Sequence, residues 1–239
     1  MVFLEGVVLL AVLVLLFCGL DARPLWGDEA ETAVLARNTI RFGIPKVDDG
    51  ANFVTLFGKG VDSNEDGVWT WSPWLQEYLT AGAFLFWGPT VWASRLPFAL
   101  AGGVSVALLS WVAYRVYRSH RVALASMLLL GSSEVFLLHA RQCRYYSVSV
   151  LAEILYVHAL YLVLSGKKRG CGALVAALWL LFYSNYILCV ASLPALLPVA
   201  WTLWRRNRRF LQTLALSVGI FLAGVAPWII YAKLWRQSQ

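Results

Sequence analysis

The segment FLEGVVLLAVLVLLFCGLDARPLWGDEAE, residues 3–31, joins a long apolar run to a cluster of carboxylates. Residues 3–20 are long and apolar enough to cross the ~30 Å hydrocarbon core of a bilayer as a helix. Glu5 stands where a signal peptide would carry basic residues, so we expect a retained transmembrane helix. Asp28, Glu29 and Glu31 then lie at the membrane edge. Asp28 and Glu31 also fit a helix-capping pattern, which is the alternative, purely structural interpretation.

The composition predicts an integral membrane protein. Of the 239 residues, 60% are hydrophobic and 14% are charged, whereas soluble domains carry roughly a quarter charged residues. The four cysteines lie in or beside apolar segments without paired spacing, which indicates neither a disulfide framework nor a zinc site.

The net charge of +7 comes from basic residues that are grouped at particular places along the chain. Basic residues cluster between apolar runs, as in cytoplasmic loops under the positive-inside rule. No segment is left over for a nucleic-acid-binding module, so we expect no nucleic-acid partner. The clusters are Arg115, Arg118 and Arg121; Lys167, Lys168 and Arg169; and Arg205, Arg206, Arg208 and Arg209.

Hydropathy predicts one all-α membrane domain, residues 1–239, with seven transmembrane helices. The apolar stretch 171–204 lies between two basic clusters that we expect on the cytoplasmic side. An even number of crossings must separate loops on the same side, so this stretch should hold two helices. We expect the break of this pair near Tyr183–Tyr186, where polar groups interrupt the apolar run. The seven expected spans are 3–20, 92–114, 122–138, 147–164, 171–187, 188–204 and 211–231.

The first extracytoplasmic loop, residues 21–79, is the largest polar segment and is acidic, with ten Asp and Glu against five Lys and Arg. Residues 28–42 read as an amphipathic helix that ends before Gly43. Residues 74–88 are apolar but short, and we expect an interfacial helix there. Asp62–Gly67 match the first half of a calcium loop, but position twelve is Pro73 instead of Glu, which favours a solvated turn.

Arginines on the outer side depart from the positive-inside rule and are candidates for anion binding. Arg141 and Arg144 share one short turn with Tyr145, and Arg95 lies near the outer start of the second span. Charged groups at membrane depth are functional candidates, and the planar guanidinium suits phosphate. Lipid headgroups or the acidic loop are the alternative partners of these arginines.

Carboxylates and arginines on one face have the chemistry to displace a phosphate from a sugar. A base must deprotonate the attacking hydroxyl, and cations must stabilise the leaving phosphate. Asp28 and Glu29 are the candidate catalytic carboxylates. Arg141, Arg144, Tyr145 and Arg95 are the candidate phosphate contacts. Other polar or aromatic residues that could line the cavity are His139, Glu134, Trp71, Trp74, Tyr183 and Asn185.

The order of several motifs resembles the GT-C superfamily of membrane glycosyltransferases, of the protein O-mannosyltransferase and aminoarabinose transferase type (glycosyltransferase family 39). These motifs are DEAETAVLARNTIRFGIP, SPWLQEYLTAGAFLFWG, RLPFALAGG and ARQCRYYSV, and the resemblance covers residues 1 to about 231. It implies a GT-C core module, with Asp28 as the catalytic base, Glu29 beside it, and donor-phosphate contacts at Arg141, Arg144 and Tyr145.

Two departures from the family pattern bear on these expectations. Ser72-Pro73-Trp74 stands where the family has His-Pro-Pro, which leaves the acceptor contacts open. The sequence also ends after the seventh expected span, whereas most relatives continue, so it can represent a minimal enzyme, a fragment or one part of a split protein.

The resemblance predicts a glycosyltransferase that moves a sugar from a polyprenyl-phosphate donor to a hydroxyl acceptor on a lipid, glycan or protein. The active site would face the extracytoplasmic side of a multi-pass protein of the cell inner membrane, among membrane lipids. No cofactor is certain; some superfamily members use a divalent cation and others do not. The alternatives are a noncatalytic lipid-linked-sugar binding or translocation subunit and an ion-coupled transporter, for which Glu153 is the deep candidate.

Overall fold

The computed structural model describes residues 1–55, 61–206 and 208–236, and within these ranges every regular element is a helix. The helices are α1 (Val2–Phe17), α2 (Gly27–Phe42), α3 (Leu75–Trp87), α4 (Val91–Tyr117), α5 (His120–Gly131), α6 (Glu134–Ala140), α7 (Tyr146–Leu164), α8 (Arg169–Ser184), α9 (Tyr186–Ser192), α10 (Leu196–Arg206) and α11 (Arg208–Ala232). Short 3₁₀ turns, η1 (Leu193–Ala195) and η2 (Leu234–Arg236), complete the described elements.

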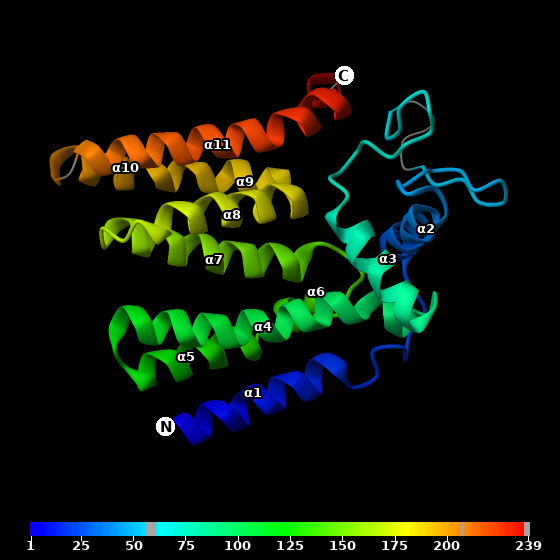
Figure 1. The fold of residues 1–239 in the computed structure, drawn as a ribbon. Helices are drawn as coiled ribbons and strands as arrows, with labels where there is room; N and C mark the ends of the chain where they lie inside the picture. Colours follow the sequence, from blue (N-terminus) through cyan, green and yellow to red (C-terminus); the bar gives the residue numbers. More distant parts are fainter. Residues whose placement is uncertain (56–60, 207, 237–239) are drawn as a thin grey trace.

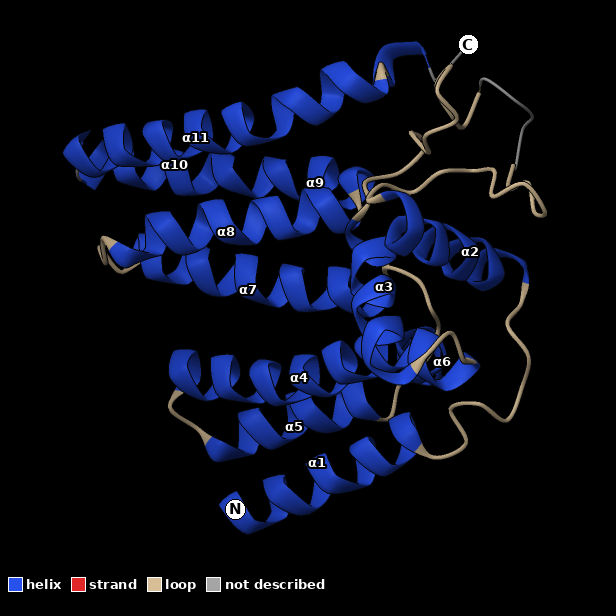
Figure 2. Ribbon diagram, turned by 45° about the vertical axis from the view of Figure 1, so that its right-hand side comes forward, coloured by secondary structure: helices blue, strands red, loops and turns tan. Residues whose placement is uncertain are grey.

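Most helices run side by side in one bundle, and α2 and α3 lie across one end of it (Figure 1). Within the bundle α7 packs between α4 and α8, α11 packs on α8, and α1 packs on α4 and α5. At the end of the bundle α2 packs on α3, which packs on α4. Figure 2 shows the same arrangement after rotation, with the long loops beside α2.

Small residues bring α1 close to α4. A Cβ added at Gly103 would lie 2.6 Å from Leu13 Cδ2 of α1, and one added at Gly102 would lie 3.6 Å from Leu16 Cδ1 of α1 and 2.9 Å from Ala140 Cβ of α6. Close approach at small residues is a common way to pack helices in membranes, where no hydrophobic force drives them together. The glycine pair therefore explains how a short apolar helix joins this bundle.

Four described helical segments are long and apolar enough to span a membrane: Val91–Tyr117, Tyr146–Leu164, Tyr186–Arg206 and Phe210–Ala232. The pair α5 and α6 qualifies as a fifth if its 66° bend lies within one span. The apolar helices α1 and α8 coincide with two further expected spans but are shorter. The structure supports a multi-pass membrane protein, and the count of seven spans stays a prediction.

Local signals in the sequence match several helix boundaries. Helix α2 ends before Gly43, whose φ of 79° is left-handed and therefore suits glycine. α8 ends at Ser184 and α9 begins at Tyr186, so the helical break falls where the polar interruption predicts it. With 13 residues, α3 would extend only ~20 Å, which is too short to cross the bilayer.

The expected start of α2 is wrong by one to two residues. Trp26 is the N-cap, so Asp28 lies inside the first turn and does not cap the helix. Instead, the backbone N–H of Trp26 donates to Glu29 Oε2 at 3.4 Å. Asp28 is therefore not needed as a cap, and Glu29 reaches back to the helix start.

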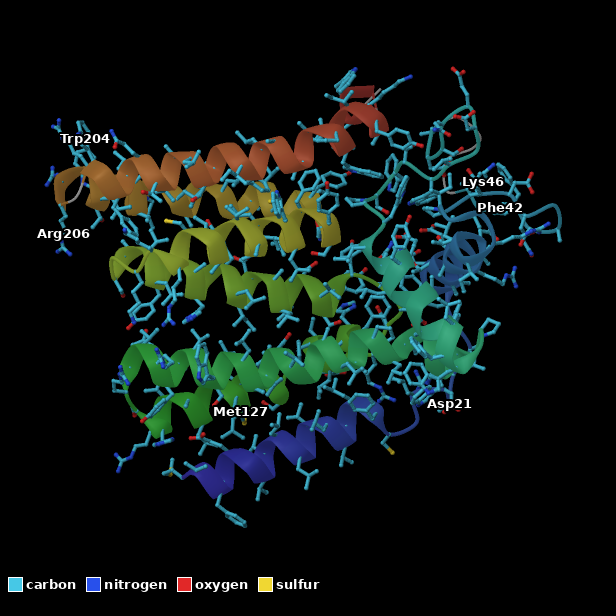
Figure 3. All side chains as sticks on the ribbon, viewed as in Figure 1. Asp21, Phe42, Lys46, Met127, Trp204 and Arg206 are labelled. Atoms are coloured by element: carbon cyan, nitrogen blue, oxygen red, sulfur yellow. The ribbon has the colours of Figure 1, made fainter. Side chains whose placement is uncertain are left out.

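The basic turns and the polar loops lie at opposite ends of the bundle. Figure 3 shows Trp204 and Arg206 at one end and Asp21, Phe42 and Lys46 at the other. The turns α4–α5, α7–α8 and α10–α11, which carry the basic clusters, all lie at the first end (Figure 1). This arrangement agrees with the charge pattern that orients the chain.

Candidate active site

The candidate site lies where the first turns of α2 and α3 meet the turn of residues 141–145, between α6 and α7. Backbone N–H groups of this turn are held by side chains from two helices. The N–H of Cys143 donates to Glu29 Oε1 at 2.8 Å, and the N–H of Tyr145 donates to Gln76 Oε1 at 3.1 Å. The turn is thus fixed to α2 on one side and to α3 on the other.

Glu29 and Arg95 form a closed, buried ion pair. Arg95 Nε lies 2.8 Å from Glu29 Oε1, and Arg95 Nη2 lies 2.6 Å from Glu29 Oε2. The other guanidinium hydrogens go to the carbonyl oxygens of Leu20, Arg23 and Pro24. Such a two-pronged pair is strong and fixes geometry. It joins α2, α4 and the α1–α2 connection, so its donors are already used within the protein.

Arg144 forms a second, more open centre. Its Nη1 lies 3.0 Å from Glu31 Oε1, and its Nη2 lies 3.5 Å from Asp28 Oδ2. Nη1 also reaches the carbonyl of Asp28 and the hydroxyl of Thr32, both at 3.3 Å. Among the described residues, the buried atoms Arg144 Nε and Glu31 Oε2 have no hydrogen-bond partner. This centre keeps hydrogen-bonding capacity for a ligand.

Gln76 and Glu77 form a buried pair at the start of α3. Gln76 Nε2 donates to Glu77 Oε1 at 2.9 Å while its own Oε1 accepts from Tyr145. Complete burial raises the pKa of Glu77 to about 8, against a smaller lowering by its hydrogen bond with Gln76. Glu77 therefore carries a proton at neutral pH.

A polar cleft of about 90 Å³ opens beside Arg144. Its charged lining consists of Glu31 and Arg144, and burial raises the pKa of Glu31, opposed by the nearby Arg144. The remaining lining residues are Trp71, Ser72, Pro73, Tyr145, Ser184, Asn185, Tyr186 and Ile187. The cleft thus combines a guanidinium, a carboxylate and aromatic rings, a suitable set for a phosphate-linked sugar.

A larger, mostly apolar cavity of about 350 Å³ borders the cleft. Tyr145 and Asn185 line both spaces, so the two are neighbours. The other residues of the large cavity are Leu130, Ser133, Val135, Phe136, His139, Ala140, Tyr146, Ser147, Ser149, Val150 and Leu188. The site therefore has a polar part and an apolar part side by side.

The structure separates the arginines that the sequence groups together. Arg144 lines the cleft, whereas Arg95 is committed to Glu29. Arg141 Nη2 donates to the carbonyl oxygens of Cys18 and Gly19 at 2.6 and 2.9 Å, and so holds the end of α1. Arg141 and Arg95 are absent from the lining of both cavities. Their contacts favour structural roles over donor binding.

The carboxylates divide in the same way. Glu29 is buried in its ion pair, and Asp28 is about one-third exposed beside Arg144 without lining the cleft. Glu31, which the sequence indicates only as part of a helix-capping pattern, is the carboxylate that lines the cleft. Glu77 carries no distinctive sequence signal, whereas Glu31 could have been found from its position about one helical turn beyond Asp28.

Of the remaining residues that the sequence predicts in the cavity, some line the cleft or the apolar cavity and others lie elsewhere. Asn185 and Trp71 line the cleft, and His139 lines the apolar cavity. Glu134 is exposed at the start of α6. Tyr183 donates its hydroxyl to the carbonyl of Gly224 at 2.8 Å and is absent from the cleft lining. It therefore supports the packing of α8 on α11.

Trp74 packs away from the cleft. Its ring lies 5.0 Å from Trp228 and 5.8 Å from Tyr231, centroid to centroid. Its Nε1 donates to the carbonyl of Trp69 at 2.7 Å. Trp74 therefore attaches the loop to α11, and Trp71 is the tryptophan that lines the cleft.

The described part of the chain holds no group of three or more His, Cys, Asp or Glu residues arranged to bind a metal ion. In the turn Asp62–Gly67, Asn64 Oδ1 accepts from the N–H groups of Asp66 and Val68. These bonds are those of an Asx-type turn.

Neither protein-family models nor curated protein sequences match the chain. Solved structures do. The crystal structure of ArnT from Cupriavidus metallidurans bound to undecaprenyl phosphate superposes with a TM-score of 0.71 at 20% identity, over 97% of this chain and 41% of that one. The apo structure of the same ArnT gives a TM-score of 0.68 at 21% identity, over 97% and 42%.

The chain therefore shares the fold of ArnT, and ArnT is an aminoarabinose transferase of the GT-C family, the family whose motifs the sequence resembles. The chain spans about two-fifths of the length of that protein.

Proposed function

We propose that the chain transfers a sugar from a polyprenyl-phosphate donor to a hydroxyl acceptor, at the end of the bundle where α2 and α3 lie. The observation that carries the proposal is the cleft beside Arg144, in which a guanidinium and a carboxylate line one small space. The fold similarity to ArnT bound to undecaprenyl phosphate supports the donor class.

Arg144 and Tyr145 are the proposed donor contacts. Nε of Arg144 has no partner within the described residues, so this edge of the guanidinium is available to a phosphate oxygen. The guanidinium also lies 5.5 Å from the centre of the Tyr145 ring, which helps to orient it. A carboxylate of α2 would take the proton of the acceptor hydroxyl; Asp28 is the candidate from the sequence.

The apolar cavity is the proposed site for the adjacent part of the prenyl chain. Tyr145 and Asn185 line both the cavity and the cleft, so the chain esterified to a phosphate at Arg144 could extend into the cavity. Apolar lining beside a charged cleft fits an amphiphilic donor better than a free sugar phosphate.

A binding or translocation subunit for lipid-linked sugars is the alternative function. Such a protein needs the guanidinium and the apolar cavity, but it has no use for a proton acceptor in the cleft. The position of Glu31 therefore favours transfer over binding alone.

The test uses the purified chain in lipid nanodiscs with a panel of polyprenyl-phosphate sugars and hydroxyl acceptors. We expect release of free polyprenyl phosphate together with a glycosylated acceptor. Binding of the donors without release would support the binding subunit, and neither binding nor release would contradict both functions.

Sidedness is tested separately by labelling single cysteines in intact cells. A cysteine at position 65, which is exposed, should react with an impermeant reagent, and a cysteine at position 168 should react only after permeabilisation. The reverse pattern would place the site on the cytoplasmic side.

A further inference from the structure

We propose that Gln76 and Glu77, at the start of α3, position the two proposed donor contacts, Arg144 and Tyr145; the inference deepens the proposed transfer function and rests on it. Gln76 and Glu77 are absent from the lining of the cleft and of the apolar cavity. Both residues are buried, with 3% and 0% of their surface exposed. They therefore act through the turn that carries Arg144 and Tyr145, and not by contact with a substrate.

Two consecutive hydrogen bonds join α3 to this turn. The N–H of Tyr145 donates to Gln76 Oε1 at 3.1 Å, and Gln76 Nε2 donates to Glu77 Oε1 at 2.9 Å. Tyr145 is the N-cap residue of α7, and the first N–H groups of a helix have no acceptor within that helix. Gln76 thus supplies the missing acceptor at the residue that lines both cavities.

The two partners of Gln76 set the orientation of its amide. A backbone N–H can only donate, so the atom that faces Tyr145 must be the amide oxygen. The amide nitrogen then faces Glu77 Oε1, which accepts its hydrogen bond. Glu77 therefore favours the one orientation of Gln76 that can hold the turn.

The neutral state of Glu77 suits this positioning role. Burial raises its pKa to about 8, and a protonated carboxyl group still accepts a hydrogen bond through its carbonyl oxygen. Arg144 is near enough to interact electrostatically with Glu77. Because Glu77 is uncharged at neutral pH, it does not compete with a phosphate for the Arg144 guanidinium.

A second contact from α3 supports the same turn. Thr80 Oγ1 lies 3.4 Å from Cys143 Sγ and donates to the carbonyl of Gln76 at 2.9 Å. Cys143 is fully buried, and burial raises the pKa of its thiol to about 12. Cysteines react as thiolates, so Cys143 should be unreactive while the turn lies against α3. Its reactivity reports the position of the turn without any substrate.

The decisive experiment removes the amide of Gln76. Gln76→Leu keeps approximately the size of the side chain but leaves the N–H of Tyr145 without its acceptor. In nanodiscs, we expect the Kd for undecaprenyl phosphate to rise by about fivefold or more. Cys143 should also react faster with a thiol reagent, as measured by mass spectrometry of its peptide. Gln76→Asn is shorter by one methylene group and should change both readouts in the same direction, also where Gln76→Leu does not fold.

Tyr156→Phe is the matched control. Tyr156 is also buried on α7, ~16 Å along the helix from Tyr145. Its hydroxyl donates to the carbonyl of Ser192 at 2.9 Å, and Tyr156 is absent from the lining of both cavities. The variant loses one hydrogen bond of α7 and some melting temperature, but its Kd and its Cys143 reactivity should stay close to those of the parent.

Two variants of Glu77, measured at pH 7, test the second hydrogen bond. Glu77→Leu removes the acceptor of Gln76 Nε2 and should raise the Kd, by less than Gln76→Leu does. Glu77→Gln keeps a carbonyl acceptor without a charge and should recover most of the affinity that Glu77→Leu loses. Equal losses in the two variants would contradict the role of Glu77 as a neutral acceptor.

A Kd of Gln76→Leu or Gln76→Asn within about twofold of the parent would overturn the assignment, and so would an equal rise in Tyr156→Phe. A parent protein that does not bind undecaprenyl phosphate would contradict the proposed function itself, and the assignment with it. Binding by the parent together with unchanged binding by the Gln76 variants would contradict the assignment alone.

Discussion

Two arginine–carboxylate centres lie side by side in this molecule and differ in how completely they are satisfied. In the Glu29–Arg95 centre, both carboxylate oxygens and all three guanidinium nitrogens have partners within the protein. In the Glu31–Arg144 centre, the described residues leave Glu31 Oε2 and Arg144 Nε without partners beside a cleft. The closed centre holds the fold together, and the open centre has capacity for a substrate.

The largest expected effect tests the closed centre. Arg95→Met should destabilise the protein by about 3–5 kcal/mol, because it leaves Glu29 buried without its countercharge. The measurement is thermal unfolding in detergent or nanodiscs. Arg144→Met is the comparison variant: the Arg144 side chain is about as buried, but it makes fewer hydrogen bonds within the protein, so the variant should lose less stability. Equal losses would remove the distinction between the two centres.

The open centre should control donor binding. Loss of one charged hydrogen bond costs about 1.5–3 kcal/mol, so Arg144→Met should weaken polyprenyl-phosphate binding by roughly tenfold to hundredfold. Arg144→Lys should recover only part of this loss, because an ammonium lacks the planar fork. Lipid-phosphate titration by tryptophan fluorescence or calorimetry measures the change.

Arg141→Ala is the control for the phosphate contact. Its guanidinium binds carbonyl oxygens at the end of α1, so donor affinity should stay close to that of the parent. If Arg141→Ala weakened polyprenyl-phosphate binding as much as Arg144→Met, Arg141 would have to be a donor contact.

A smaller, pH-dependent effect is expected at Glu77. The folded state holds its proton up to a pKa of about 8, whereas an ordinary Glu loses it near 4.5. The folded state therefore binds more protons between these values, and the contribution of Glu77 to stability falls as pH rises from about 4.5 to about 8. Glu77→Gln, which cannot ionise, should gain melting temperature relative to the parent at pH 8.5 and gain least at pH 4.5. A pH-independent difference would contradict the buried, protonated state.

The smallest effect is expected at an exposed pair. Arg37 Nη2 lies 3.1 Å from Asp49 Oδ2, but the arginine side chain is half exposed. Exposed pairs contribute little to stability, so Arg37→Ala should leave the melting temperature close to that of the parent. A shift comparable with that of Arg95→Met would show that burial does not explain the cost of breaking the Glu29–Arg95 pair.

The fold was largely predictable because its signals are local. Apolar runs located the helices of the bundle, Gly43 ended α2, and the polar residues at Tyr183–Tyr186 located the break between α8 and α9. The start of α2 was misplaced because Asp28 fits an N-cap pattern, while the true cap position, Trp26, has no capping side chain and takes its partner from Glu29. The order of motifs also indicated the GT-C fold.

The candidate site was predictable only as a set of residue types at one end of the bundle. The sequence by itself determined that carboxylates of α2 and the turn with Arg144 would lie at that end, because helix length and charge pattern fix on which side each segment ends. The tertiary structure alone decided that Arg95 pairs with Glu29, that Arg141 holds α1, and that Glu31 enters the cleft. These contacts join residues 66 to 123 positions apart, and no periodicity within a single helix specifies which distant partner a charged side chain meets.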